Sequence, residues 1–338
     1  MEIPIQNIYY LLCYAWDKLE EKELIDVDPV GMTELVDLFA RVLSAGTNHV
    51  LKRGFDRNYV GRDEWTSRLR GKIAFAVVAK TGTLTAALPC ELDELSYDVL
   101  HNQILKATLV RLIRTEKISR QNADELSGLV RHLTEVRDIE ITSRGFGQVQ
   151  LHRNNRFYDF LMKVCELIHR NLLISEASGR SRFREFSRDR QQMAVLYESF
   201  VRNFYRIHSR YKVKREDIYW NWIAEDQVAA GLLPKMQTDI SLTADGRKII
   251  IDCKYTPEAT QHHYDANTLR SAHLYQINAY LDNLSSADSS CEAMLLYPTV
   301  DKPLLASYTH KAHRISIRTI NLNQPWPEIH RDLLALVA

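Results

Sequence analysis

Hydrophobic side chains recur every three to four residues through much of the chain, which is the spacing of one face of an α-helix. Residues 5–44 show this spacing twice and predict two helices, separated by a loop at 26–31 that contains an Asp-Pro pair. The same spacing returns over 99–135, and it predicts further helices over 156–173 and about 190–208. Much of the N-terminal half is therefore expected to be helical.

Residues 50–95 have a different pattern, in which short apolar runs are interrupted by glycines. The runs KIAFAVVAK and LTAALPCEL belong to this stretch, and Gly54, Gly61, Gly71 and Gly82 interrupt it. Glycines between short apolar runs are typical of strands joined by tight turns. We expect a small, irregular, β-rich unit here.

Another pattern begins near residue 218 and predicts strand, hairpin, strand, helix and strand in that order. The segments MQTDISL and KIIIDCKY form the first strand pair, and the Asp-Gly step between them favours a tight hairpin turn. A helix is predicted over 268–284, and strands over 293–297 and 315–322. We expect an α+β chain whose C-terminal half is an α/β domain around a mixed central sheet.

A length of 338 residues corresponds to about two domains. No repeat, low-complexity tract or Pro/Ser-rich linker marks the boundary between them. We place it near residue 150. This gives an N-terminal domain, 1–150, with a β-rich insertion at about 50–95, and a C-terminal domain, 151–338.

The overall composition excludes several classes of protein. Hydrophobic residues make up 45% and charged residues 26%, with a formal net charge of +1, which is ordinary for a globular chain and unlike a disordered one. No run of about 18 uncharged apolar residues and no signal peptide is visible, so we expect a cytoplasmic protein without a membrane partner. The five cysteines contain no C-x-x-C pair, which argues against a disulfide scaffold or a zinc ribbon.

The near-neutral total hides a basic middle segment. Residues 151–220 hold fifteen Lys and Arg against eight Asp and Glu, a difference of +7. Within them, the stretch GRSRFREFSRDR interleaves arginines with two phenylalanines. Composition leaves two interpretations open, a solvated loop or a strip that contacts DNA phosphates. On the second interpretation, the candidate DNA-binding residues are Arg180, Arg182, Arg184 and Arg188.

Two acidic residues and a lysine meet in the predicted hairpin. Asp252 and Lys254 are two apart on one strand and share a face, and an antiparallel register brings Asp239 beside them. Carboxylate oxygens are preferred ligands of Mg²⁺, which activates water for phosphodiester hydrolysis, while an ammonium group can orient that water. The backbone carbonyl of Cys253 can supply a further oxygen. The pattern predicts a Mg²⁺ site at Asp239, Asp252 and Cys253, with Lys254 catalytic.

This pattern also has a simpler interpretation. KIIIDCKY is apolar on both faces and should be buried, so its acid and lysine need a partner, either each other in a structural ion pair or a metal ion. Gln276 and Tyr280 lie four apart on one face of the predicted helix and are candidate catalytic residues that can reach a phosphate or the attacking water. Glu198, on the predicted helix before the sheet, is a candidate metal ligand. Taken alone, each of these three is more often an ordinary helix-surface residue.

These residues resemble the McrC family, the nuclease subunits of McrBC modification-dependent restriction systems, within the PD-(D/E)XK nuclease superfamily. The resemblance covers most of the chain, in the segments NIYYLLCYAW, RLRGKIAF, DELSYDVLHNQILKATL, RNNRFYDFL, LLPKMQTDISL, IIIDCKYT, LYQINAYL, LLYPTV and NLNQPWPEIH. By position, Asp239, Asp252 and Lys254 match the family's catalytic acid, second acid and lysine. The superfamily name has a proline before the first acid, whereas this chain has Thr238 there, and in this it resembles the McrC subgroup.

The resemblance implies a division of labour between two proteins. McrC-like proteins work with McrB, a hexameric AAA+ GTPase that recognises modified cytosine in DNA, and this chain contains no G-x-x-x-x-G-K-[ST] loop of its own. The N-terminal part of McrC-like proteins enters the McrB ring and stimulates GTP hydrolysis. The resemblance therefore makes 1–150 the partner-binding domain and 151–338 the nuclease domain. Dimerisation of nuclease domains between assemblies is implied for double-strand cleavage.

The basic side chains around the β-rich insertion are candidate contacts to the GTPase, with a solvated basic loop as the alternative. They are Arg53, Arg57, Arg62, Arg68, Arg70 and Lys72. The expected function is that of a Mg²⁺-dependent DNA endonuclease subunit in a GTP-dependent, modified-cytosine-specific restriction complex. Two alternatives stay open: a non-catalytic adaptor that regulates a ring GTPase, and a stand-alone DNA-repair nuclease. The intact acid-acid-lysine set argues against the first, and the long N-terminal region against the second.

Overall fold

The chain was analysed as a computed structural model, which describes residues 3–18, 34–68, 71–81, 87–151, 155–174, 181–183, 186–256, 260–263, 266–284, 291–299 and 303–338. The chain forms two compact units, one of Met1–Lys22 with Glu185–Ala338 and the other of Glu23–Arg184. These units do not coincide with the expected domains 1–150 and 151–338. The reason is that the N-terminal helix packs with the C-terminal elements, while the helix at 156–171 packs with earlier helices.

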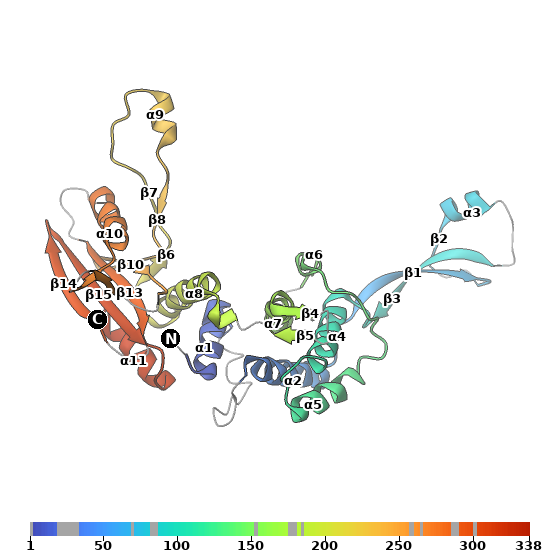
Figure 1. The fold of residues 1–338 in the computed structure, drawn as a ribbon. Coiled ribbons are helices and arrows are strands. Elements are labelled where there is room, and N and C mark those ends of the chain that lie inside the picture. Colours follow the sequence, from blue (N-terminus) through green and yellow to red (C-terminus); the bar gives the residue numbers. More distant parts are fainter. Residues whose placement is uncertain are drawn as a thin grey trace. The chain divides into compact units, whose positions relative to one another are not determined.

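The first unit is built on a six-stranded mixed sheet of order β14-β15-β13-β10-β9-β6 (Figure 1). Its strands are β6 (Lys212–Lys214), β9 (Ile240–Ala244), β10 (Arg247–Cys253), β13 (Glu292–Thr299), β14 (Leu305–His310) and β15 (His313–Asn321). The three central strands β10, β13 and β15 are parallel, whereas β6, β9 and β14 run antiparallel to their neighbours. The expected α+β fold with a mixed central sheet is confirmed.

The predicted hairpin is formed by β9 and β10. Asp245 and Gly246 at its tip have φ values of 49° and 77°, the left-handed backbone that a two-residue type I′ turn requires. The register pairs Ile240 with Ile251. Side chains alternate between the two faces of a sheet along each strand. Asp239, just before Ile240, and Asp252, just after Ile251, are therefore on the same face, at the end of the hairpin opposite the turn.

Helices cover both faces of this sheet (Figure 1). On one face, α10 (Ser271–Leu284) packs its Ile277 and Leu281 against the alternate sheet residues Ile250 and Leu295. Ile249 and Ile251 are buried on the other side, where α8 contacts β10 and α11 contacts β15. Helix α8 is Arg190–His208 and helix α11 is Trp326–Ala335. A third helix, α1 (Ile5–Ala15), packs on α8.

Aromatic rings join α1 to α8 and α11 in the first unit. The Tyr14 ring centroid lies 5.6 Å from that of Phe200 and 5.1 Å from that of Trp326. Asn7 also donates hydrogen bonds through Nδ2 to the carbonyls of Leu322 and Gln324, at 2.8 and 2.9 Å. The first helix of the sequence is thus part of the core beneath the C-terminal sheet.

Two short hairpins interrupt segments that the sequence predicted to be regular. MQTDISL is divided, because β8 (Met236–Gln237) pairs with β7 (Asp217–Ile218) and β9 starts three residues later. The helix predicted from residue 268 begins at Ser271 instead, since Ala266–Leu269 is strand β12, paired with β11 (Thr260–His263). The prediction was wrong at these two boundaries.

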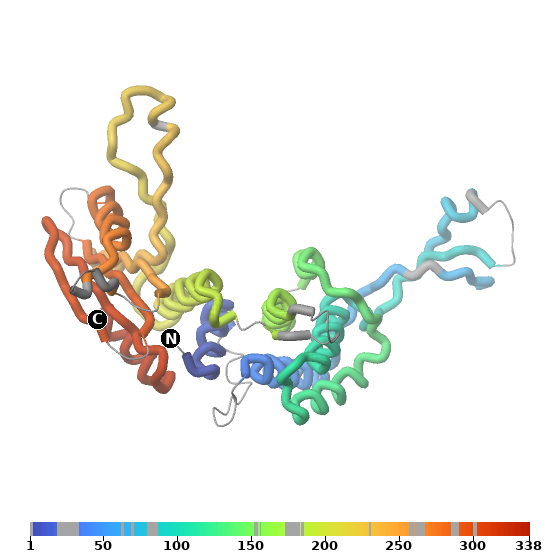
Figure 2. The backbone as a smooth tube through the Cα atoms, viewed as in Figure 1, coloured from blue at the N-terminus to red at the C-terminus, as the bar shows by residue number. Residues whose placement is uncertain are grey.

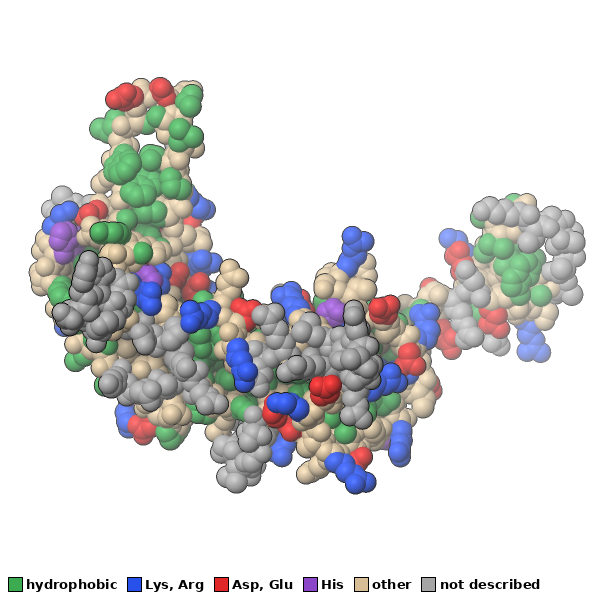
Figure 3. All heavy atoms as spheres, viewed as in Figure 1, with side chains coloured by type: hydrophobic (Ala, Val, Ile, Leu, Met, Phe, Trp, Pro, Cys, Tyr) green, Lys and Arg blue, Asp and Glu red, His purple; other side chains and the backbone are tan. Residues whose placement is uncertain are grey.

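The chain between β7 and β8 makes a long excursion from the sheet and carries the short helix α9 (Gln227–Leu232) (Figure 2). Large hydrophobic side chains are exposed along it, and Figure 3 shows them gathered on this segment. They are Tyr219, Trp222, Ile223, Val228 and Leu232. An exposed apolar surface of this kind is uncommon on a monomer and typical of contact sites.

The second unit is mainly helical. Its helices and short strands are α2 (Leu35–Arg53), α4 (Leu100–Ile113), α5 (Arg120–Val130), α6 (Ser143–Gly147), α7 (Arg156–Asn171), β4 (Leu172–Ile174) and β5 (Ser181–Phe183). Helix α4 packs against α5 and α7, and α2 packs against both of these as well. This confirms the predicted helices at 35–44, 99–135 and 156–173, while the loop predicted at 26–31 lies outside the described residues. None of the helices in the described part of the chain is long and apolar enough to cross a membrane.

The expected β-rich insertion is a three-stranded antiparallel sheet of order β1-β3-β2. Its elements are β1 (Asn58–Thr66), β2 (Lys72–Ile73), α3 (Phe75–Thr81) and β3 (Leu88–Ser96). The run KIAFAVVAK is strand only in its first two residues and continues as α3. Gly71, with a φ of 70°, needs to be glycine, since a Cβ would lie 2.3 Å from the Glu91 carbonyl oxygen.

Candidate active site

The hairpin of β9 and β10 brings the two predicted acids together. Asp239 precedes β9 and Asp252 is the penultimate residue of β10, directly beyond the Ile240–Ile251 pair. The backbone N–H of Cys253 donates a hydrogen bond to Asp239 Oδ2 at 2.8 Å. Asp239 is half-buried and Asp252 is fully buried. Two carboxylates therefore share one end of the hairpin.

Asp252 is a buried carboxylate with an incomplete set of partners. Lys254 Nζ lies 2.7 Å from its Oδ2 atom, so the ion pair considered from the sequence is present. The other oxygen, Oδ1, is buried and has no hydrogen-bond partner among the described residues. Because a buried carboxylate oxygen without a partner is costly, an oxygen-seeking cation fits this position.

Electrostatics in the site favour a bound cation as well. Burial, followed by the negative charges of Asp252 and Glu198, raises the pKa of Asp239 from 3.8 to about 7. Burial also raises the pKa of Asp252, against the opposing effect of Lys254. Both carboxyl groups thus hold their protons more tightly than usual, and a divalent cation would release them.

A chain of hydrogen bonds holds Lys254 in place. Its Nζ donates to Gln276 Oε1 at 2.8 Å, and Gln276 Nε2 donates to Tyr280 Oη at 2.7 Å. Tyr280 in turn donates to the carbonyl of Gln237 at 2.9 Å. The structure therefore places Gln276 and Tyr280 next to the predicted acid-acid-lysine set, where Gln276 contacts the ammonium group of Lys254 and Tyr280 contacts Gln276.

Glu198 is close enough to the two acids for its charge to raise both of their pKa values. Its carboxylate is engaged by two arginines, with Oε1 2.6 Å from Arg202 and 3.7 Å from Arg215. Among the described residues, no group of three or more His, Cys, Asp or Glu side chains is arranged to hold a metal ion. The residues that fit a Mg²⁺ ion best are Asp239 and Asp252, with water in the remaining positions, as Mg²⁺ commonly has.

Thr238 explains why proline is absent before the first acid. Its backbone N–H donates to the Glu216 carbonyl at 3.0 Å, a bond that proline cannot make. Its hydroxyl oxygen accepts from the Glu216 N–H at 3.0 Å and lies 3.0 Å from Ser241 Oγ. The buried threonine thereby fixes the chain immediately before Asp239.

Three further residues lie around Lys254 that the sequence analysis did not find. Tyr297 in β13 follows Leu296, which pairs with Cys253, so it is the cross-strand neighbour of Lys254. Its Oη lies 2.8 Å from Nδ1 of His273, on α10. Arg270 precedes the same helix, and its charge lowers the pKa of His273. The available signal was that His273 lies three residues before Gln276 and shares its helix face.

The predicted DNA-binding arginines are only partly described. Arg180 and Arg184 lie outside the described residues, as does the side chain of Arg182, whose backbone belongs to β5. Arg188 is exposed at the end of the short 3₁₀ helix η3 (Phe186–Arg188). Their contact with DNA stays a prediction.

The predicted partner-binding residues that the structure describes are spread along the β1–β3 sheet, with Arg53 and Arg57 at its base and Arg68 and Lys72 further along it. Arg53 ends α2, and the guanidinium of Arg57 lies over the Tyr97 ring at 4.1 Å and donates to its hydroxyl. Arg68 is exposed after β1, and Lys72 is exposed in β2. Arg70 and the side chain of Arg62 lie outside the described residues.

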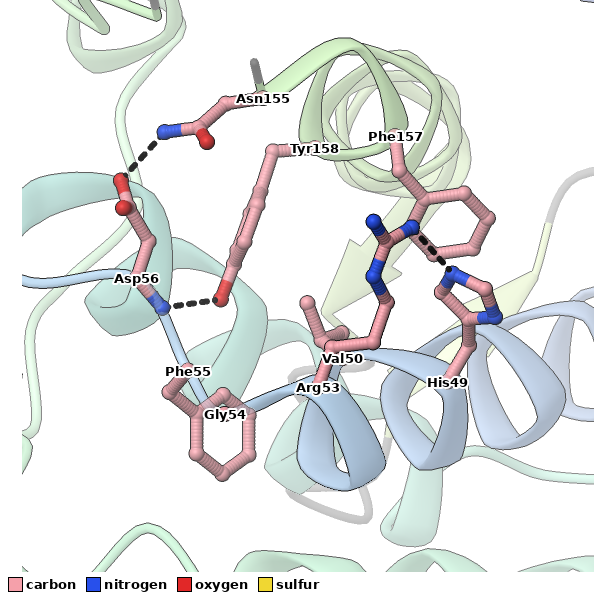
Figure 4. Close-up of a pocket in the computed structure, with 9 residues that line it drawn as sticks. All are labelled: His49, Val50, Arg53, Gly54, Phe55, Asp56, Asn155, Phe157 and Tyr158. Carbon is pink, nitrogen blue, oxygen red and sulfur yellow. Dashed lines mark hydrogen bonds between the residues drawn. The ribbon is translucent and has the colours of Figure 1, made fainter.

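A small pocket of about 210 Å³ lies at the same base, with Arg53 and Asp56 on its walls (Figure 4). Asp56 Oδ2 accepts from Asn155 Nδ2 at 2.6 Å, and its N–H donates to Tyr158 Oη at 3.1 Å. Asn102 donates to the Asp56 carbonyl at 3.0 Å. These bonds tie the start of the β-sheet to α4 and α7, so the pocket walls have a structural role.

The comparisons with known proteins agree with this architecture. A family model described as "McrBC 5-methylcytosine restriction system component" matches residues 6–298. The chain is 30% identical over 335 residues to the Escherichia coli (strain K12) protein "Type IV methyl-directed restriction enzyme EcoKMcrBC", which covers 98% of this chain and 96% of that protein.

A solved structure shares the fold. It is described as a half-complex from a tetradecameric assembly of Thermococcus gammatolerans McrB AAA+ hexamers with bound McrC. One of its chains matches with a TM-score of 0.62 and 17% identity, over 99% of this chain and 76% of that one. The mixed sheet, with two acids and a lysine gathered at one end of its β9–β10 hairpin, defines an α+β protein with an acidic candidate site. The chain belongs to the family of McrBC 5-methylcytosine restriction system components.

Proposed function

We propose that this chain is the Mg²⁺-dependent DNA endonuclease subunit of a GTP-dependent restriction complex that acts on DNA containing modified cytosine. The observation that carries the proposal is the pair of carboxylates beside Lys254, one fully buried and one half-buried. Asp252 is fully buried, its Oδ1 has no hydrogen-bond partner among the described residues, and the pKa of Asp239 is raised to about 7. A purely structural ion pair needs only one of these two acids.

The residues of the site divide the chemistry among themselves. Asp239 and Asp252 would hold Mg²⁺, which supplies a more acidic bound water and offsets negative charge on the phosphate. Lys254, held by Gln276 and Asp252, presents its ammonium group at the same edge and can orient the attacking water. Gln276 and Tyr280 keep that ammonium in position. The backbone carbonyl of Cys253 and the carboxylate of Glu198 stay predicted ligands.

The partner in this proposal is an McrB-like hexameric AAA+ GTPase, whose GTP hydrolysis the chain stimulates and which activates cleavage. Family membership supports this, because the solved relative contains McrB hexamers with bound McrC. We assign the contact to the β1–β3 sheet and its helix α3, whose exposed side chains include Tyr59, Trp65, Phe75 and Leu95. A thin sheet with exposed aromatic side chains, flanked by Arg53 and Arg57, has the surface of a docking element.

The test is cleavage of methylated and unmethylated DNA by this chain together with the GTPase of its own restriction system, with GTP and Mg²⁺ present. Asp252→Asn and Lys254→Met are each expected to lower the cleavage rate by at least about 10³-fold, because each removes part of the reacting site. GTP hydrolysis stimulated by the chain should stay near the wild-type rate. Asp245→Asn, at the far end of the hairpin, is the matched control and should cleave normally.

The outcomes separate this function from its alternatives. Cleavage at the wild-type rate by Asp252→Asn would refute the assignment of the site. Stimulated GTP hydrolysis without any cleavage of modified DNA would instead favour the non-catalytic adaptor. Cleavage that needs neither GTP nor the partner would favour a stand-alone nuclease.

A further inference from the structure

Two N–H donors without partners lie beside the carboxylate pair, at the beginning of α10. Arg270 Nε is buried and makes no hydrogen bond within the described part of the chain. No carboxylate among those residues forms an ion pair with Arg270 either. His273, one turn further along, contacts Tyr297 through Nδ1, and its Nε2 makes no hydrogen bond to a described residue. A buried N–H without a partner, such as Arg270 Nε, calls for an acceptor from outside the chain, and His273 Nε2 is placed to donate to the same acceptor.

The two donors lie next to the lysine of the site. His273 and Gln276 are neighbours on one face of α10, and Gln276 accepts from Lys254 Nζ. From the other direction, Tyr297 is the cross-strand neighbour of Lys254 and contacts His273. The charge of Arg270 is close enough to lower the pKa values of both His273 and Tyr297. Both donors therefore belong to the edge of the site that faces α10.

The tautomer of His273 follows from its surroundings. Burial, with the positive charges of Lys254 and Arg270, lowers the pKa of His273 to about 4, so the ring is neutral at neutral pH. Burial raises the pKa of Tyr297 to about 12, so its hydroxyl keeps its proton. That hydroxyl lies 2.8 Å from Nδ1 and has no other acceptor among the described residues, so we assign it as the donor to Nδ1. The ring proton is then on Nε2, the nitrogen without a partner.

We propose that Arg270 and His273 bind a backbone phosphate of DNA next to the phosphate that is hydrolysed, and that Tyr297 positions the His273 ring for this contact. The inference rests on the proposed nuclease function, which makes DNA the polyanion at this edge. The charges are divided accordingly. The acids lie on the β9–β10 hairpin, where a cation fits. The guanidinium of Arg270, whose Nε has no partner among the described residues, lies on the α10 side, where phosphate oxygens fit.

Binding of a short fluorescent DNA duplex to the full-length chain tests this, with EDTA present so that the duplex is not cut. Arg270→Gln should weaken binding by about tenfold and lower the slope of log affinity against log salt by about one. Arg270→Lys keeps the charge but loses the Nε donor, so it should weaken binding with the slope nearly kept. Arg210→Gln is the matched control. Arg210 is an exposed arginine near the hairpin turn, paired with Asp245 at 3.5 Å, and should change neither quantity.

Tyr297 is tested through His273. His273→Ala should weaken binding by about threefold without changing the salt slope, because the ring is neutral. Tyr297→Phe should weaken binding less in the wild-type background and not at all in the His273→Ala background, since it acts only by orienting that ring. A purely structural tyrosine would give the same effect in both backgrounds.

The outcomes are distinct from those of the nuclease proposal. Unchanged affinity and slope in Arg270→Gln would overturn the phosphate contact, as would an equal loss in Arg210→Gln. Absence of wild-type binding at low salt would overturn it too. If the wild-type complex failed to cut modified DNA, the nuclease function would fall, while a difference between Arg270→Gln and Arg210→Gln would still show the contact.

Discussion

The carboxyl group of Asp239 is held where its own ionisation is costly. Burial is the largest cause, and the charges of Asp252 and Glu198 add to it, so the pKa rises from 3.8 to about 7. A raised acid pKa means that the folded state binds the proton more tightly than the unfolded state. In the metal-free protein, the contribution of Asp239 to the free energy of unfolding is therefore largest below about pH 4. This contribution is lost as the pH rises to about 7.

Asp239→Asn should remove this pH dependence, because the amide cannot ionise yet keeps an oxygen to accept from the Cys253 N–H. In EDTA the free energy of unfolding of the variant and the wild type should be similar near pH 4. Above pH 7 the variant should be more stable by on the order of 2–4 kcal/mol. Urea unfolding across this range measures the difference, with the exposed Asp245→Asn as control. A constant difference at every pH would contradict the assignment.

The same carboxyl group predicts how metal binding depends on pH. A divalent cation needs Asp239 ionised, so protons compete with it until the pH exceeds about 7. The affinity for Mn²⁺, measured by electron paramagnetic resonance, should rise up to about tenfold per pH unit below pH 7 and level off above it. An affinity independent of pH from 5 to 8 would show that Asp239 is not a ligand.

At the scale of elements, the sequence correctly predicted the features that depend on neighbouring residues in the chain. Helix 190–208, the Asp-Gly hairpin and the meeting of Asp239, Asp252 and Lys254 follow from helical spacing, turn chemistry and strand alternation. Strands β7 and β8 and helix α9 were missed because they are short. The apolar residues of α9 and of the chain before it are mostly exposed and β7 has one buried residue, Ile218, so this segment shows no core-facing periodicity. The positions of His273 and Tyr297 near Lys254 were missed because they depend on which strand lies beside β10, and such a non-local pairing cannot be predicted from one strand alone.

Gly71 sets the geometry of the β1–β3 sheet and gives an element-scale prediction. Gly71→Ala places a Cβ 2.3 Å from the Glu91 carbonyl at a φ of 70°, so it should loosen the pairing of β2 with β3. The expected cost is about 1–3 kcal/mol, with faster amide exchange in β3 and weaker stimulation of the GTPase. Gly61→Ala is the matched control in β1, because a Cβ there meets nothing within 4 Å. Full protection and full stimulation in Gly71→Ala would contradict the proposed docking role.

At the scale of the whole molecule, the first residues of the chain belong to the same compact unit as the last ones. Helix α1 packs on α8, and its Tyr14 lies among the aromatic rings of α8 and α11. The sheet that carries the candidate active site therefore depends on residues more than two hundred positions earlier in the sequence. A division near residue 150 is a poor guide for truncation, because it would separate α1 from this core.

Leu11→Ala tests this dependence of the sheet unit on the first helix. Leu11 is fully buried in α1, so the loss of its side chain should cost about 2–5 kcal/mol of unfolding free energy. Ile223→Ala removes a similar side chain that is 97% exposed, and it should change stability by less than about 0.5 kcal/mol. Hydrogen exchange should show the lost protection of Leu11→Ala in β10 and β13. Loss confined to α1 would mean that the sheet holds the site without its N-terminal helix.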